Sequence, residues 1–277
     1  MPHTHVEATV ETAERAGDGE SEDRIFLLPQ AVIVLDGATS VELGPGSGGW
    51  YADMLGQQLA RQLASSDGPD LRDALAEAIA SLAVTHDLRP GRAPSAAVTI
   101  LRWTAQVVEG LVLCDTSLAL QSLGKQTTVL HDDRLHKLDH PHRAAYLEAI
   151  RTGSAFDRER LRYMQAFTRE YRNRPGGYWV AEAVPEAANE AVRGVWPREE
   201  VAAALLATDG AAAGVDTYRV IDDWAAGFAM AKDRGVEAML DLVHQTELGD
   251  PQARRWPRFK THDDKALAFV QFPMEAW

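Results

Sequence analysis

A short apolar run that ends in Asp-Gly constrains this chain more than any other segment. Residues Ala31 to Leu35 are apolar and mostly β-branched, and Asp36 and Gly37 follow directly. A continuous apolar run of this length is typical of a strand that is buried on both faces. An aspartate held at the end of such a strand, followed by a glycine whose carbonyl can approach a ligand closely, suits a hard cation. The other interpretation is an ordinary turn, because Asp-Gly is a common turn dipeptide.

The same design recurs elsewhere in the chain. Acids stand at the ends of three further apolar segments, namely Asp209, the pair Asp263 and Asp264, and the pair Glu22 and Asp23. If these strands pack side by side, their carboxylates converge. A dense carboxylate cluster does not stay ionised at neutral pH without compensation, and oxygen-only ligands favour Mg²⁺ or Mn²⁺ over zinc. The sequence therefore predicts a divalent-cation site assembled from distant segments.

Six segments, in order along the chain, resemble the motifs of the metal-dependent serine/threonine protein phosphatases of type 2C (PPM-type). They are Glu22-Asp23, Val34–Gly37, Pro94–Leu101, Leu111–Leu120, Ala207–Gly210 and Asp263-Asp264. Periodicity alone predicts an α+β fold in which helices cover sheets. The resemblance, which runs through nearly the whole chain, implies more: a four-layer α-β-β-α sandwich of two mostly antiparallel sheets, flanked by helix pairs, as in a bacterial member of the family.

The resemblance also implies roles for individual residues. Asp36 and Asp209 would be the central catalytic carboxylates, and Asp115 would help to hold a third ion, as in bacterial members. The implied metal-binding set is Glu22, Asp23, Asp36, Gly37, Asp115, Asp209 and Asp263. Two Mn²⁺ or Mg²⁺ ions, bridged by Asp36 and a water, would make hydroxide available near neutral pH for in-line attack on phosphorus.

One position departs from the family pattern. The family usually has an arginine four residues before its Glu-Asp pair, where it binds the substrate phosphate, and here that position is Asp18. Arg15 and Arg24 are the nearby candidates for binding phosphate, although neither stands at the motif position. A bidentate arginine is hard to replace in phosphate recognition. Three functions therefore stay open: a phosphatase of phosphoserine and phosphothreonine proteins, a catalytically weak pseudophosphatase that acts as a binding or regulatory module, and a phosphatase of a small phosphoester.

Length, charge and cysteine content indicate the domain organisation, the class of partner and the cellular compartment. The 277 residues contain no linker-like run or convincing repeat, so we expect one phosphatase-like domain over 1–277, with a helical, flap-like insertion at about 142–176. The net charge of −13 disfavours nucleic acid as a partner. No apolar run approaches the ~20 residues of a membrane span, the N-terminus lacks a signal-peptide pattern, and a single cysteine forms no internal disulfide. We therefore expect a cytoplasmic enzyme whose partner is a phosphorylated protein, not nucleic acid or a membrane.

Hydrophobic periodicity also predicts particular elements between these motifs. Helices are expected over 50–64, 70–85, 142–171 and, as a pair, between 218 and 246, and strands over 96–103, 107–120, 127–130 and 178–184. Asp115 would then lie inside a strand. The short gaps between the three middle strands predict antiparallel hairpins.

Overall fold

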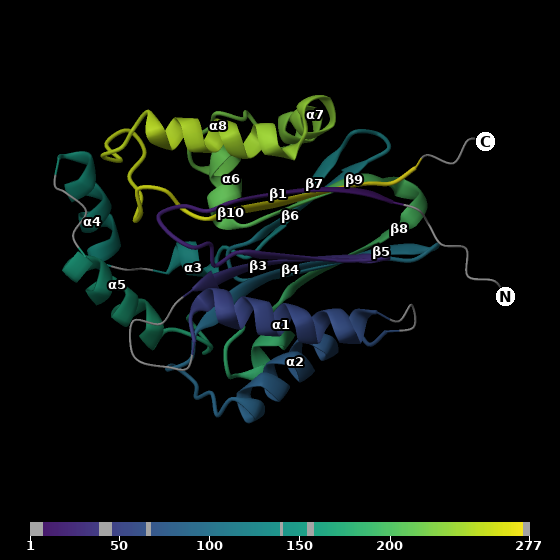
Figure 1. Ribbon diagram of the computed structural model, residues 1–277, viewed down its shortest axis with the longest axis horizontal. Coiled ribbons are helices and arrows are strands. Elements are labelled where there is room, and N and C mark those ends of the chain that lie inside the picture. Colours follow the sequence, from purple (N-terminus) through teal and green to yellow (C-terminus); the bar gives the residue numbers. More distant parts are fainter. Residues whose placement is uncertain (1–7, 39–45, 65–67, 139–140, 154–157, 274–277) are drawn as a thin grey trace.

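Two five-stranded sheets pack face to face in the computed structural model, and helices cover both outer faces (Figure 1). The structure describes residues 8–38, 46–64, 68–138, 141–153 and 158–273. Every pair of neighbouring strands in both sheets is antiparallel. The predicted α+β, four-layer sandwich is therefore confirmed.

The first sheet has the order β1 (Thr9–Arg15), β10 (Lys265–Gln271), β9 (Val201–Ala207), β6 (Ser117–Ser122) and β7 (Thr127–His131). The second sheet has the order β2 (Arg24–Leu28), β3 (Ala31–Ala38), β4 (Ser95–Trp103), β5 (Val107–Leu113) and β8 (Val192–Pro197). The helices are α1 (Gly48–Leu63), α2 (Leu71–Thr85), α3 (Arg134–Lys137), α4 (Pro141–Arg151), α5 (Arg158–Glu170), α6 (Asp209–Asp216), α7 (Trp224–Arg234) and α8 (Val236–Leu248). Two short 3₁₀ helices cover Pro185–Glu190 and Arg198–Glu200.

Capping side chains and a glycine set the boundaries of the two helix pairs. Asp70 caps α2, and its side chain accepts a hydrogen bond from the Arg72 N–H at 2.8 Å. Ser47 caps α1 in the same way through the Trp50 N–H. Gly235, at a φ of 84°, separates α7 from α8, because glycine adopts this left-handed conformation without a steric penalty. Both predicted helix pairs are therefore confirmed. None of the helices in the described ranges has the length and apolarity needed to cross a bilayer.

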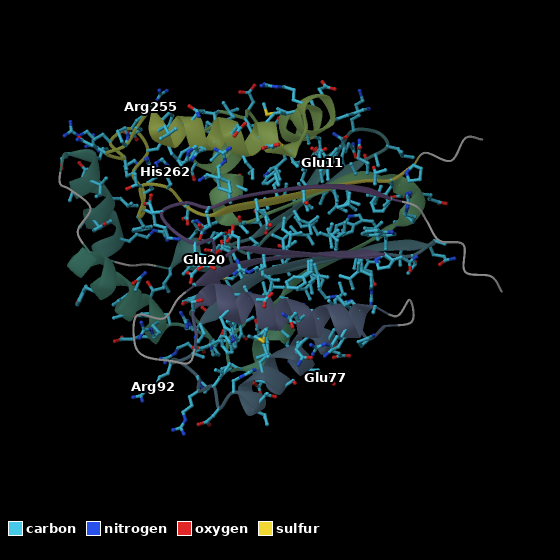
Figure 2. All side chains as sticks on the ribbon, in the orientation of Figure 1. Glu11, Glu20, Glu77, Arg92, Arg255 and His262 are labelled. Atoms are coloured by element: carbon cyan, nitrogen blue, oxygen red, sulfur yellow. The ribbon has the colours of Figure 1, made fainter. Side chains whose placement is uncertain are left out.

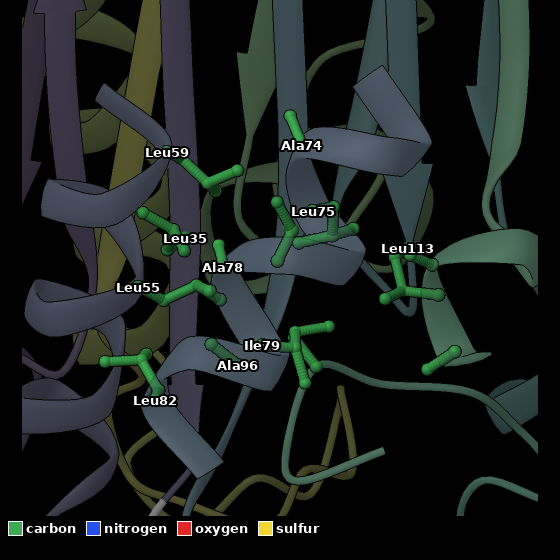
Figure 3. Packing of buried hydrophobic residues seen from close by; sticks show 14 of the residues in the cluster. Leu35, Leu55, Leu59, Ala74, Leu75, Ala78, Ile79, Leu82, Ala96 and Leu113 are labelled. Atoms are coloured by element: carbon green, nitrogen blue, oxygen red, sulfur yellow. The ribbon is translucent and has the colours of Figure 1, made fainter. Parts of the chain in front are cut away.

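Hydrophobic side chains fill the three spaces between the four layers. In β3, Val32 and Val34 pack into the space between the sheets, whereas Ile33 and Leu35 face the helices. Figure 3 shows this second space, where side chains of α1 and α2 pack on Leu35. The third space lies under α7 and α8. The prediction of a strand buried on both faces is thus confirmed, since all four residues are fully buried.

The predicted single strand over 107–120 is wrong. The chain leaves β5 after Leu113, and Cys114 adopts a φ of 70°. It then enters β6, which belongs to the opposite sheet. Asp115 therefore lies in a crossover between the sheets, not inside a strand. Thr116 anchors this crossover, because its hydroxyl is hydrogen-bonded to that of Thr99 on β4 at 2.7 Å in a fully buried position.

The predicted strand over 178–184 is also wrong. This segment forms only isolated bridges, such as the one between Ala96 and Ala181. Side chains hold it in place, since the buried Glu182 pairs with Arg172 at 3.0 Å and accepts from the Gly91 N–H. The helix expected over 142–171 is divided into α4 and α5, and the sequence pattern did not predict β8 or α6.

Candidate metal centre

Five aspartates converge at one end of the sandwich. They are Asp23 just before β2, Asp36 in β3, Asp115 in the crossover, Asp209 at the start of α6 and Asp263 just before β10. Figure 2 shows side-chain oxygens gathered between the sheets near the labelled Glu20, at the end where α4 and α5 lie. Burial raises the pKa of Asp36 well above its usual range, and the charges of the other four aspartates raise this pKa further.

The pKa values of Asp263 and Asp209 are also raised. Burial, followed by the charge of Asp209, raises the pKa of Asp263 to about 6, while the Lys260 ammonium opposes this rise. Burial and the charge of Asp115 raise the pKa of Asp209, and a hydrogen bond with Asp36 opposes them. The carboxylates therefore repel one another, and a bound cation would relieve that repulsion.

One buried oxygen marks a place for such a cation. Asp23 is only 2% exposed, and within the described residues its Oδ2 atom has no hydrogen-bond partner. A buried carboxyl oxygen without a hydrogen-bond partner is costly. The donor set here consists of carboxylate and backbone oxygens, which are the ligands that Mg²⁺ and Mn²⁺ prefer. The residues present thus fit divalent cations, and their assignment as ligands stays a prediction.

Two glycines let the acid-bearing segments touch through their backbones. A Cβ on Gly37 would lie 2.6 Å from the carbonyl oxygens of Glu22 and Gly48. A Cβ on Gly210 would lie 2.0 Å from the carbonyl oxygen of Asp264. Both glycines of the Asp-Gly pairs are therefore required by close backbone approach, rather than by a turn.

The predicted Glu22 lies at the edge of the cluster, beside the start of α1. Its Oε1 atom accepts from the Gly49 N–H at 3.4 Å. Asp264 instead joins two segments, because its carboxylate accepts from the N–H groups of Gly17 at 2.8 Å and Glu22 at 3.0 Å. The sequence alone did not separate this bracing role from the role of Asp263, since the two acids are adjacent.

The two predicted phosphate-binding arginines make structural contacts. Arg15 pairs with Asp241 on α8. Arg24 donates to the carbonyl oxygens of Ser21 at 2.6 Å and Asp23 at 2.7 Å, so its guanidinium supports the loop that carries an acid of the cluster. Asp18 accepts a hydrogen bond from the His262 N–H at 3.3 Å.

Two other cations bear on the aspartates. Arg143 belongs to the arginine-rich helical segment expected at 142–171, whereas the sequence pattern did not single out Lys260. The Lys260 Nζ atom is 2.5 Å from Asp263 Oδ1. Arg143, on α4, is half-buried, and burial lowers its pKa while the charges of Asp115 and Asp209 raise it. Lys260 stands three residues before Asp263, which is the one sequence signal for its position.

A buried ion pair fixes the backbone behind Asp263. Lys265 is fully buried, and its ammonium donates to Glu247 Oε2 at 2.8 Å and to the Asp263 carbonyl at 2.7 Å. Glu247 also accepts from the Tyr218 hydroxyl at 3.1 Å. Ligand atoms of Glu247 and two histidines lie within 4.8 Å of one another. Because Lys265 already neutralises the carboxylate, we interpret this group as a structural ion pair rather than a metal site.

A second ion pair positions the crossover that carries Asp115. Arg134 donates to both carboxylate oxygens of Asp132, at 2.8 and 2.7 Å. Asp132 in turn accepts from the Cys114 N–H at 3.2 Å. A bidentate pair of this kind is both strong and geometrically specific. The residue next to Asp115 is thereby held in its left-handed conformation.

The two-sheet sandwich is similar in fold to solved PPM-type serine/threonine phosphatases. Comparison of the sequence with protein-family models and with curated proteins gives no match. Comparison of the fold gives solved structures that are similar over almost the whole chain. One is the PPM Ser-Thr phosphatase MsPP from Mycobacterium smegmatis in complex with cacodylate, with a TM-score of 0.56, 15% identity, and coverage of 96% of this chain and 98% of that chain.

Two further structures show the same similarity. The serine/threonine phosphatase Stp1 from Staphylococcus aureus has a TM-score of 0.58 and 13% identity, and the match covers 98% of this chain and 96% of that chain. The catalytic domain of the serine threonine protein phosphatase PstP, in complex with 2 manganese ions, has a TM-score of 0.55 and 13% identity. This match covers 95% of this chain and 97% of that chain. The resemblance predicted from the motifs is confirmed at the level of the fold.

Proposed function

We propose that this protein is a divalent-metal-dependent phosphatase that hydrolyses phosphoserine or phosphothreonine in proteins. The observation that carries the proposal is the convergence of five aspartates, with a buried and unpaired Asp23 oxygen among them. A fold alone does not define a function, so the site has to support it. The similar PstP structure contains 2 manganese ions, which supports Mn²⁺ as the first metal to test.

Some side chains of the site would bind the cations, and others would hold these ligands in position. Asp36, Asp209, Asp263 and the Gly37 carbonyl would bind two ions directly, and Glu22 and Asp23 would meet them mostly through water. Asp115 would help to hold a third ion. Divalent cations bound here would supply a water of lowered pKa and would neutralise charge on phosphoryl oxygens. Asp263 is oriented through its own carbonyl, which Lys265 holds. The protein itself needs no covalent nucleophile for such a reaction, and the buried Cys114 keeps a structural place.

The experiment that tests this function is hydrolysis of an aryl phosphate with Mn²⁺, with a chelator, and in the variant Asp209→Asn. We expect turnover that depends on the metal and falls by at least about a hundredfold in the variant, because a central ligand is lost. Asp73→Asn, on the exposed face of α2, is the matched control and should retain full activity. A phosphopeptide and a sugar phosphate then separate a protein phosphatase from a phosphatase of a small phosphoester. Metal-independent turnover would contradict the proposal.

A second function, that of a weakly catalytic binding module, is favoured by one specific observation. Asp18 replaces the arginine expected from the family motif, and Arg15 and Arg24 are engaged in structural contacts. Tight Mn²⁺ binding in calorimetry, without turnover of any phosphoester, would support this alternative. The absence of both metal binding and turnover would exclude both functions.

A further inference from the structure

The acidic end of the sandwich carries two cations from segments that are far apart in the sequence. Lys260 lies in the segment before β10 and contacts Asp263. Arg143 lies in the first turns of α4, which stands beside the segment preceding β10 in Figure 1. The Lys260 Nζ atom is 2.5 Å from Asp263 Oδ1, and Arg143 packs over the ring of the adjacent Phe259.

A small hydrophobic cluster connects the two segments. Phe259, next to Lys260 in the sequence, stacks on Tyr146 of α4, with the ring centroids 5.7 Å apart and an angle of 19° between the planes. The Arg143 Cζ atom lies 5.5 Å from the centroid of the same Phe259 ring. Ile150 and Ala253 complete the cluster and are almost fully buried. Phe259 therefore joins the segment that carries Lys260 to the helix that carries Arg143.

We propose that Arg143 and Lys260 form a two-cation clamp that binds the phosphate group of the substrate beside the metal centre. This inference rests on the proposed function, since it concerns the same site. The terminal oxygens of a phosphate group can accept more bonds than two metal ions would supply. Guanidinium and ammonium groups are the usual protein donors to the remaining positions.

The contacts of the two cations fit this role better than a purely structural one. The Lys260 side chain remains about half exposed at 52%, so its ammonium can move from Asp263 to an incoming anion. A cation bound by Asp263 would weaken the ion pair with Lys260 and release the ammonium for phosphate. Arg143 stays in place against the aromatic ring, which limits the loss of side-chain entropy on binding.

The experiment measures binding of inorganic phosphate to the Mn²⁺-loaded protein by calorimetry, together with the KM for an aryl phosphate. Arg143→Gln and Lys260→Gln should each weaken phosphate binding about tenfold and raise KM, without weakening Mn²⁺ binding. Arg151→Gln is the matched control, because Arg151 lies on the same helix and pairs with Glu148 at an exposed position. Arg143→Lys keeps the charge and should recover part of the phosphate affinity. Circular dichroism confirms that each variant is folded.

The outcomes separate this clamp from the metal chemistry. If both Gln variants bind phosphate as the wild type does, while Mn²⁺ binding and turnover persist, the clamp is wrong and the proposed function stands. If the wild type binds Mn²⁺ but no phosphate, the clamp is also wrong. If the wild type neither binds Mn²⁺ nor hydrolyses the aryl phosphate, the proposed function fails and the clamp fails with it.

Discussion

Lys265 places an ammonium group where no solvent reaches it, at the first residue of β10. Its charge is balanced by Glu247, and its remaining hydrogen bond goes to the backbone of Asp263. Replacing a whole buried ion pair can be nearly neutral, but removing one partner leaves a charge without compensation. The Lys265 ammonium therefore serves both the stability of the fold and the position of Asp263 in the candidate metal centre.

We expect Glu247→Leu to lower the free energy of unfolding by about 3–5 kcal/mol, because the buried Lys265 ammonium would lose its counter-ion. Urea denaturation measures this change. Glu237→Leu, on the exposed face of the same helix, should change the free energy by no more than about 0.5 kcal/mol. Equal and small effects of the two substitutions would show that Lys265 does not depend on Glu247.

A second prediction at this scale concerns the Lys260 ammonium, which competes with any cation that Asp263 would bind. Removing a positive charge 2.5 Å from that carboxylate should favour the metal. We expect Lys260→Gln to tighten Mn²⁺ binding about fivefold, which corresponds to about 1 kcal/mol for a partly exposed pair. Calorimetric titration with Mn²⁺ measures the change, and Lys232→Gln on the exposed side of α7 provides the comparison. Weaker Mn²⁺ binding in Lys260→Gln would mean that the lysine supports the metal ligands instead.

Helix α4 is attached to the rest of the molecule by a hydrophobic cluster that is separate from the three hydrophobic spaces between the layers. It contacts the segment before β10 through Phe259 and the buried Ala253. Such a peripheral element can open locally without unfolding the sandwich. Phe259 is the member of this cluster that contacts Arg143 directly.

We expect Phe259→Ala to increase amide hydrogen exchange in α4 by at least about tenfold, while exchange in β3 and β9 stays unchanged. Hydrogen–deuterium exchange with mass spectrometry resolves the three elements. Tyr163→Ala, at a position of α5 that is 58% exposed, is the control and should leave α4 as protected as in the wild type. Unchanged protection of α4 in Phe259→Ala would show that other contacts hold the helix.

The elements that the sequence predicts are those whose local pattern agrees with their burial. The apolar run from Ala31 to Leu35 predicts β3 because every position is buried, and Asp70 predicts the start of α2 because a cap is a local interaction. The crossover at Cys114 escapes prediction, because no glycine or proline marks its left-handed conformation. That conformation is held instead by Asp132, an acid that follows β7 and becomes a neighbour only after folding.

The residues of the candidate site also fall into two groups, those that the sequence predicts and those that it does not. The five aspartates are predictable because each stands at the end of an apolar segment or in a recognisable motif. Arg143 and Lys260 are not, because their approach depends on Phe259 packing against α4, which is a tertiary contact. Charge runs on helices are common, so a single arginine in α4 carries no signal of its own in the sequence.

For the molecule as a whole, the aspartate cluster should lower the stability of the metal-free protein, and the proposed cations would offset this cost. Burial and mutual repulsion raise the pKa values of Asp23, Asp36 and Asp209 in the folded state. Ligands that bind only the folded state stabilise it by mass action. The same carboxylates should therefore destabilise the metal-free fold and stabilise the loaded one.

This trade-off predicts how stability changes with pH. The pKa of Asp263 is about 6 in the folded state, against an ordinary value of 3.8. Between these two values the folded state holds more protons than the unfolded state, so stability falls as pH rises. The contribution of Asp263 is fully present below its unfolded pKa and is lost as pH passes the folded pKa.

We therefore expect the metal-free protein, in a chelator, to lose stability as the pH rises from about 4 to about 6. Urea denaturation across this range measures the slope, and Asp263→Asn should make it shallower because one such acid is removed. With saturating Mn²⁺ the slope should reverse, since the metal competes with protons for the same oxygens and binds better as the acids ionise. A metal-free protein whose stability rises through this window, with the same slope in Asp263→Asn, would mean that the cluster is already compensated by groups of the protein itself. In that case Lys260 and Arg143 would be acting as its permanent counter-ions rather than as ligands for phosphate.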